Sequence, residues 1–200
     1  MTGIQDSVRL QNALTLIDTA NAEDPRDEEG QPKELLYGRR MGEMLSRYLP
    51  DASEVVRLAV RAQHLRRWRI PRTDYPADRD GYYHWRNALY RFHAEQAGCL
   101  LAEAGYDAER IARVEAAVGK RQLPFNPDAQ DVEDVAALVF LEHYLAGFVA
   151  QKMDYSEDKL RNIIIRTWRK MSPAARQFVL DDGVSLPVHL VPLIRSVVAK

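Results

Sequence analysis

The periodicity of the apolar residues is the feature that most constrains the fold of this chain. Along the whole sequence, apolar side chains recur at intervals of three and four residues, which is the spacing of one face of an α-helix. No two runs of alternating apolar and polar residues are joined by a hairpin turn, so nothing in the pattern indicates a β-sheet. The pattern therefore predicts an all-α protein, folded as a single-domain helical bundle.

Breaks in the pattern divide the chain into about eight helices. We expect them at about 7–22, 32–48, 51–69, 81–104, 107–118 and 132–151, followed by two closing helices capped by Ser156 and Ser172. Asp107 is the expected cap of the fifth helix, Asp51 and Glu54 are spaced as a capping box for the third, and Trp85 is expected on the core side of the fourth. Residues 181–200 contain two prolines and form a C-terminal tail that is only partly helical. The whole chain, 1–200, is expected to be one domain.

Composition limits the functions that the chain can have. Its 28 Lys and Arg residues are balanced by 29 Asp and Glu residues, which argues against a non-specific nucleic-acid binder. The single cysteine, Cys99, excludes an intramolecular disulfide and a cysteine-rich zinc site. No apolar run approaches the roughly 18 residues that a membrane span needs, and the N-terminus lacks the apolar core of a signal peptide. We therefore expect a cytoplasmic protein without a membrane partner.

The stretch RAQHLRRW, residues 61–68, is the most informative segment for function. On a continuous helix, His64 and Trp68 would share a face with Arg61 and with Arg57 in the turn before it. Six arginines lie between residues 57 and 72 with no acidic residue among them. Because guanidinium groups can hold phosphate oxygens bidentately, we expect this segment to bind a small phosphorylated ligand. The alternative is a solvated helix face paired with acidic loops. The residues expected to contact the ligand are Arg61, Arg66, Arg67 and Trp68.

Histidines in apolar helices suggest a metal site. Neutral imidazoles combined with a carboxylate bind divalent transition metals, which can activate water for attack on a phosphoester. We expect His64, His93 and Asp134 to be the ligands, with manganese, cobalt, nickel, iron or zinc as the metal and no organic cofactor. Alternatively, His93 and Asp134 are structural polar residues in a helical core.

Two further residues are candidates for catalytic roles. Lys120 follows Gly119 at a helix end, where its amine could hold a substrate phosphate or interact with the last helical carbonyls. Glu95 is an additional carboxylate, although a position two residues from His93 on a helix points to roughly the opposite side. Asn21, Asp24 and Tyr37 flank the acidic loop, and the sequence indicates no chemical role for them.

Three stretches together resemble known families: RAQHLRRW, YHWRNALYRFHAEQAG and DVEDVAALVFLEH. Over about residues 18–171 the chain looks similar to a family of bacterial and fungal proteins known only as a domain of unknown function. The order of His64, His93 and Asp134 more loosely resembles the HD-type metal-dependent phosphohydrolases. That superfamily is all-helical and binds metal with a His, an adjacent His-Asp pair and a distal Asp. The resemblance implies an HD-like core at about 55–150 and a phosphohydrolase that acts on a nucleotide or small phosphoester.

One position departs from the HD signature. The signature has Asp after the second His, whereas this chain has Ala94. A metal site would need a substitute ligand, for which the candidates are Glu95, Glu133, Glu142 and His143. If none substitutes, the chain is expected to be a non-catalytic anion- or nucleotide-binding regulatory protein on the same fold. RNA binding through the arginine-rich segment is a third hypothesis, which the neutral overall charge and the absence of a known RNA-binding module disfavour.

Overall fold

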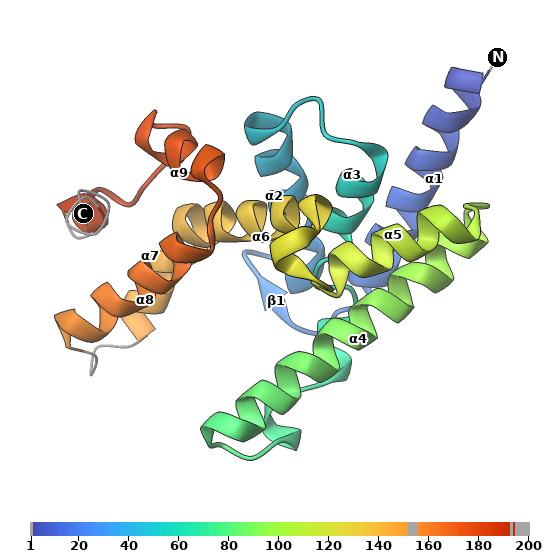
Figure 1. Cartoon of the computed structure of the whole chain (residues 1–200). Coiled ribbons are helices and arrows are strands. Elements are labelled where there is room, and N and C mark those ends of the chain that lie inside the picture. The colour runs from blue at the N-terminus through green and yellow to red at the C-terminus, as the bar shows by residue number, and fades with distance from the viewer. Residues whose placement is uncertain (1, 152–155, 193, 195–200) are drawn as a thin grey trace.

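The computed structural model describes residues 2–151, 156–192 and 194, and Figure 1 shows them as helices joined by short connections. The described residues form nine α-helices, and their only β-structure is one antiparallel ribbon of two short strands. The prediction of an all-α bundle is therefore confirmed. The helices are α1 (Thr2–Ala22), α2 (Lys33–Tyr48), α3 (Glu54–Arg61), α4 (Arg79–Glu103), α5 (Ala108–Val118), α6 (Pro127–Val139), α7 (Leu145–Gln151), α8 (Glu157–Lys170) and α9 (Pro173–Leu180), and the strands are β1 (Asp27–Glu28) and β2 (Gln31–Pro32).

Side-chain caps fix several helix starts. The predicted caps of α5, α8 and α9 are confirmed, since each side chain accepts a hydrogen bond from a backbone N–H three residues later. These caps are Asp107, Ser156 and Ser172. The expected capping box of the third helix is wrong, because Ser53 rather than Asp51 accepts the hydrogen bond, from the N–H of Val56.

The third helix ends earlier than its periodicity predicts. We expected it to continue to about residue 69, but α3 ends at Arg61 and the chain turns through residues 62–66. Arg66 has a positive φ of 52°, and its N–H donates to the side chain of Asn21 at the end of α1. A short 3₁₀ turn, Arg67–Arg69, follows. RAQHLRRW is therefore not one helix face, and its side chains point to several parts of the molecule.

The sixth predicted helix is divided in two. It begins at Pro127, because Asn126 caps it and proline is well suited to the first helical position. A π-helical turn, Phe140–Tyr144, then separates α6 from α7. Such turns occur frequently at functional sites, and Phe140 and Tyr144 both line the cleft described below.

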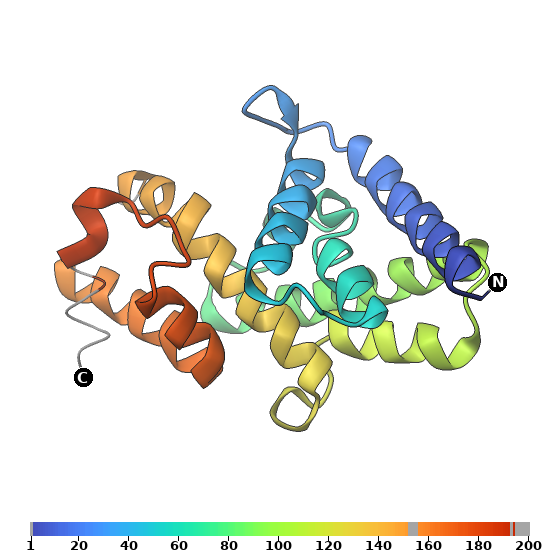
Figure 2. The same cartoon turned by 90° about the horizontal axis from the view of Figure 1, so that it is seen from above.

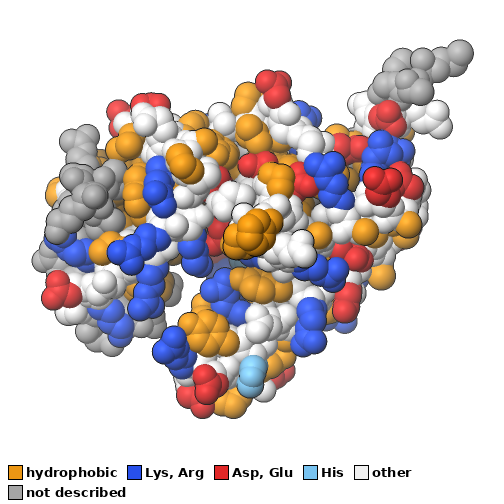
Figure 3. All heavy atoms as spheres, in the orientation of Figure 1, with side chains coloured by type: hydrophobic (Ala, Val, Ile, Leu, Met, Phe, Trp, Pro, Cys, Tyr) orange, Lys and Arg blue, Asp and Glu red, His pale blue; other side chains and the backbone are white. Residues whose placement is uncertain are grey.

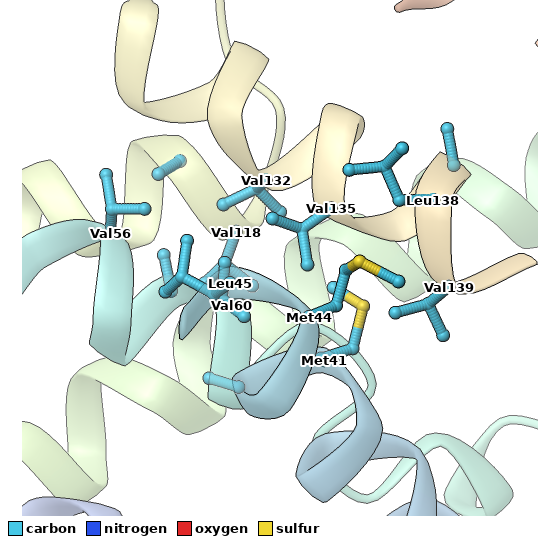
Figure 4. Packing of buried hydrophobic residues seen from close by; sticks show 14 of the residues in the cluster. Met41, Met44, Leu45, Val56, Val60, Val118, Val132, Val135, Leu138 and Val139 are labelled. Atoms are coloured by element: carbon cyan, nitrogen blue, oxygen red, sulfur yellow. The ribbon is translucent and has the colours of Figure 1, made fainter. Parts of the chain in front are cut away.

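The central core lies between α2, α3, α5 and α6, as Figure 4 shows. Met41 and Met44 of α2 point toward the valines and leucine that α6 contributes, while α3 and α5 close the other side. Fully burying an apolar side chain of this size contributes roughly 1.5–3 kcal/mol, so these contacts fix the relative positions of the four helices. The residues concerned include Val56, Val60, Val118, Val132, Val135, Leu138 and Val139.

The remaining helices surround this core unevenly. Helix α4 packs along α5, and its N-terminal half extends away from α5 (Figure 1). Figure 2 shows α8 and α9 on one side of α6, with α1 on the opposite side of the molecule. The predicted tail comprises residues 181–200, and its first helical segment is the 3₁₀ turn Val188–Leu190. Residues 195–200 of this tail lie outside the described residues. Within the described ranges, no helix combines the length and apolar character needed to cross a membrane.

Candidate ligand-binding site

A cleft lies between the first turns of α2, the connection 62–78, the N-terminal half of α4 and the end of α6. Figure 3 shows an indented surface there, with Lys and Arg side chains gathered around it. The cleft consists of an outer cavity of about 560 Å³ and an inner cavity of about 250 Å³. The two cavities are adjacent, because both are lined by Tyr37, His64, Arg67, Trp85 and Ala136. Their size is that of a small-molecule site, roughly 300–1,000 Å³.

His64 lies at the junction of the two cavities. Its ring stacks on Tyr37, with ring centroids 4.0 Å apart. Its Nδ1 lies 3.1 Å from Glu34 Oε2, and its Nε2 lies 3.3 Å from a guanidinium nitrogen of Arg67. Since a carboxylate only accepts and a guanidinium only donates, Nδ1 carries the proton and Nε2 accepts. Burial and the charge of Arg67 lower the pKa of His64 to about 4, so the imidazole is neutral at pH 7.

Glu34 is a buried carboxylate that positions His64. Burial alone would raise its pKa, but interactions with His64, Arg67 and Arg26 outweigh burial and lower the pKa of Glu34 to about 2. Arg26 donates to Glu34 Oε1 over 2.7 Å, and the backbone N–H of Glu34 donates to Asp24. Glu34 is therefore ionised at neutral pH and holds the Nδ1–H tautomer of His64.

Asn21 and Asp24, to which the sequence assigned no role, support this arrangement. Asp24 accepts hydrogen bonds from the side chain and backbone of Arg26 and from the backbone of Glu34. Asn21 accepts from the N–H of Arg66 and donates to the carbonyl of Glu34. Both side chains are buried, so they join the end of α1 to the start of α2 and to the turn that carries His64.

His93 lines the inner cavity from α4 and is almost fully buried, with 2% of its surface exposed. Its Nδ1 lies 2.8 Å from the carbonyl oxygen of Leu65, which can only accept, so Nδ1 carries the proton. Its Nε2 is buried without a hydrogen-bond partner. Burial, with a contribution from His64, lowers the pKa of His93 to about 3. A second neutral imidazole, with its ring centroid 6.0 Å from that of His64, therefore lines the cleft.

Arginines surround Trp85 at the centre of the cleft. The guanidinium carbons of Arg67 and Arg72 lie 4.8 Å and 6.0 Å from the Trp85 ring centroid, and Trp85 Nε1 donates to the carbonyl of Ile70. Arg86 lies against the rings of Tyr82 and Tyr90. Among the described residues, none of these three arginines forms a salt bridge with a carboxylate. Trp85 is half-buried and lines both cavities, so the expectation that it packs in the core is wrong.

The cationic side chains that line the cleft outnumber its acidic side chains, although Arg26, Lys33 and Lys120 form salt bridges with carboxylates. Glu34 is the only carboxylic acid among the described residues that line either cavity, and it already bonds Arg26 and His64. Because desolvated charges interact strongly with a counter-charge, an anion entering the cleft would be attracted to it. The cationic lining residues are Arg26, Lys33, Arg67, Arg72, Arg86 and Lys120.

Lys120 reaches the inner cavity from the turn after α5. Its φ is 51°, and its ammonium group lies 5.5 Å from the Tyr90 ring centroid. The same group forms a salt bridge with Glu133, which also pairs with Lys170 over 3.4 Å. The charge of Lys120 is therefore partly neutralised, unlike that of Arg67.

The fold brings together five of the residues predicted to form the site and places four others elsewhere. His64, His93, Arg67, Trp68 and Lys120 line the cleft. Arg61 instead forms a two-pronged ion pair with Asp18, and Arg66 donates to Gln96. Glu95 is exposed on α4, on a different side from buried His93.

Asp134 has structural partners in place of His64 and His93. It is fully buried, and its oxygens accept hydrogen bonds from Gln130, from the hydroxyl of Tyr48 and from the backbone N–H of Ser172. It lines neither cavity. Among the described residues, no group of three or more His, Cys, Asp and Glu side chains is arranged to hold a metal ion. The two histidines therefore meet in the cleft without the predicted carboxylate.

Sequence reasoning did not identify several residues of the cleft. Tyr82, Arg86 and Tyr90 recur at intervals of four and share a face of α4 with Trp85 and His93, and this mixed aromatic and cationic stripe was a detectable signal. Glu34 left no comparable signal, because an acidic residue in the first turn of a helix is common.

Comparisons with known proteins give one family. A family model described as "Domain of unknown function (DUF4202)" matches residues 11–194 of the 200 residues. No curated protein and no solved structure matches the chain.

Proposed function

The chain belongs to the DUF4202 family, and we propose that it binds a small phosphorylated ligand in the cleft between α2, α4 and α6. One observation carries this proposal: Arg67, Arg72 and Arg86 converge on the cleft, and among the described residues none of them forms a salt bridge with a carboxylate. A guanidinium group without a counter-ion in a desolvated site is costly. A phosphate group offers the oxygens that would compensate it.

Arg67 is the central cation of the proposed site. It lines both cavities, and its guanidinium contacts the neutral Nε2 of His64 and the ring of Trp85. The charge of Glu34 acts on it without a salt bridge between the two groups. Burial lowers the pKa of Arg67, although an arginine stays charged at pH 7. An anionic ligand would compensate the buried positive charge of Arg67. We therefore expect the anionic group of the ligand to contact Arg67.

The outer cavity favours a ligand that also has an apolar or planar part. Beyond the cations, it is lined by the aromatic rings of Tyr37, Trp68, Phe140 and Tyr144. Such rings can pack against a flat group while the arginines hold the phosphate. A nucleotide or another small phosphoester fits this combination.

Calorimetric titration with inorganic phosphate and with nucleoside 5′-monophosphates tests the proposal. We expect Arg67→Gln to weaken binding at least about tenfold, because it removes charge-assisted hydrogen bonds. The matched control is Arg69→Gln in the same 3₁₀ turn, because Arg69 is exposed and lines neither cavity. Absence of binding to the wild-type protein, or equal affinities of the wild type and Arg67→Gln, would contradict the proposal.

A second candidate function is hydrolysis of the same phosphoester with a divalent metal, as the HD resemblance implies. The observation that favours it is the anchoring of both imidazoles at Nδ1, by Glu34 for His64 and by the Leu65 carbonyl for His93. Metal-binding histidines are typically held in this way, which leaves Nε2 for the metal. A metal bound there would supply a Lewis acid and an activated water. Asp134 cannot complete that ligand set from its present position, because its oxygens accept hydrogen bonds from Tyr48, Gln130 and Ser172.

Metal titration separates this second function from simple anion binding. Because the Arg67 guanidinium approaches the Nε2 of His64, a metal would have to displace it. The hydrolase hypothesis therefore expects Arg67→Gln to bind manganese, cobalt, nickel, iron or zinc more tightly than the wild type, and His93→Asn to lose this binding. If neither the wild type nor Arg67→Gln binds any of these metals, the chain is not a metal-dependent hydrolase.

A further inference from the structure

Two residues that line the inner cavity each have a buried hydrogen-bond acceptor without a partner. Among the described residues, four buried side-chain nitrogen or oxygen atoms have no partner, and two of them are Gln63 Oε1 and His93 Nε2. Both residues line the inner cavity, and they are only 5% and 2% exposed. Leaving a buried polar atom unsatisfied is unfavourable, and such atoms are rare in folded proteins. Two in one cavity indicate a ligand that donates hydrogen bonds.

The charge of the cavity restricts the chemistry of that donor. Arg67, Arg86 and Lys120 line the same 250 Å³ space, so an ammonium or guanidinium donor would be repelled. His93 Nε2 has a free lone pair because its Nδ1 donates to Leu65. The complementary donor is therefore a neutral group, and in so small a cavity it must lie close to the phosphate that the arginines attract. A hydroxyl group on a carbon near the phosphoester meets both requirements.

We propose that the inner cavity selects a phosphorylated polyol or sugar, whose hydroxyl groups donate to Gln63 and His93 while its phosphate contacts Arg67 and Arg86. This inference rests on the proposed phosphate-binding function and specifies the class of ligand. Gln63 and His93 act in it as specificity-determining residues, and the arginines provide affinity for any phosphate.

The test compares glycerol 1-phosphate with n-propyl phosphate, which differ only in two hydroxyl groups. We expect the wild-type protein to bind glycerol 1-phosphate about tenfold or more tightly, since a hydrogen bond to an otherwise unsatisfied buried group commonly has this effect. Gln63→Met should reduce this preference and leave the affinity for n-propyl phosphate nearly unchanged. His93→Asn should have the same effect, because an asparagine amide can still donate to the Leu65 carbonyl.

Arg67→Gln separates failure of this inference from failure of the proposed function. It should weaken both ligands by a similar factor and leave the ratio of their affinities unchanged. If neither ligand binds the wild type, the phosphate-binding function itself is wrong. If both bind equally well, or if the preference for glycerol 1-phosphate persists in both Gln63→Met and His93→Asn, the phosphate site stands and the polyol selection is overturned. Thermal melting of each variant confirms that it folds, and Gln63→Met tests the inference even where His93→Asn does not fold.

Discussion

Two arginines of the RAQHLRRW segment have different environments because their partners differ. Arg61 is neutralised by Asp18, whose two oxygens lie 2.6 Å and 2.5 Å from its guanidinium nitrogens. Arg67, six residues later, contacts only a neutral imidazole and an indole ring among its close partners. The first arginine ties α3 to α1, whereas the second has no salt bridge among the described residues and lines the cleft. Residue type alone does not distinguish them.

Ala94 occupies the position at which HD enzymes have an aspartate. Ala94 is fully buried and lies against Gly119 at the end of α5. A Cβ atom added to Gly119 would lie 3.5 Å from the Cβ atom of Ala94. The neighbouring His93 lines the inner cavity. Position 94 therefore belongs to the packing between α4 and α5.

We predict that Ala94→Asp destabilises the protein and does not create a metal site. An unpaired carboxylate in this packed position should lower the free energy of unfolding by about 3 kcal/mol or more. Urea unfolding followed by circular dichroism measures this change. Asn87→Asp on the exposed side of α4 is the matched control and should change stability by less than about 0.5 kcal/mol. A stable Ala94→Asp protein with increased affinity for manganese would contradict the prediction.

At the scale of elements, Asp134 connects α6 to the two closing helices. Its Oδ1 accepts the N–H of Ser172, which in turn caps α9, and the amide of Gln130 bridges Asp134 to the last carbonyl of α8. The hydroxyl of Tyr48 from α2 donates to the other oxygen. One buried carboxylate thus holds α2, α6, α8 and α9 together.

This role predicts a separation between stability and binding. Asp134→Ala leaves several donors without an acceptor and should lower the free energy of unfolding by about 2–4 kcal/mol. Phosphate binding should stay within about twofold of the wild type, because Asp134 lines neither cavity. Urea unfolding and calorimetric titration of the same preparation test both parts. Loss of metal binding in this variant, with stability unchanged, would instead support a metal-ligand role.

At the scale of the whole molecule, the buried histidines make stability depend on pH. The pKa values of His64 and His93 are lowered to about 4 and about 3, below the ordinary value of 6.5 that they regain on unfolding. Between pH 6.5 and 4 the unfolded chain therefore binds protons that the folded chain does not, and stability falls with pH in this window. The lowered pKa of Glu34, about 2 against 4.5, adds a further loss below pH 4.5.

We predict a loss of about 2–3 kcal/mol for each of the two histidines between pH 6.5 and 4. Urea unfolding at several pH values measures the slope. His93→Asn should remove about half of the slope between pH 6 and 4.5, because its replacement does not titrate. His84→Asn, at an exposed position of α4, is the matched control substitution. A slope unaffected by His93→Asn would show that another group controls acid stability.

Local sequence determined the class of the fold and many of its boundaries. The spacing of apolar residues indicates where helices form, because one face of each helix must be buried. The caps of α5, α8 and α9 depend only on a side chain and on a backbone N–H three residues later. The sequence also identified His64, His93 and Arg67 as residues of interest, because histidines in apolar segments and clustered arginines are unusual.

The tertiary structure alone decided where these side chains point. Helical spacing relates residues only while the helix continues, and α3 stops at Arg61, where Asn21 of α1 holds the following turn by a hydrogen bond to Arg66. The long-range packing that places Glu34 beside His64, and Asp134 beside Ser172, leaves no trace in local periodicity. The positively charged cleft is therefore a property of contacts between distant segments. The same contacts decide which of the predicted site residues line the cleft and which stabilise the fold.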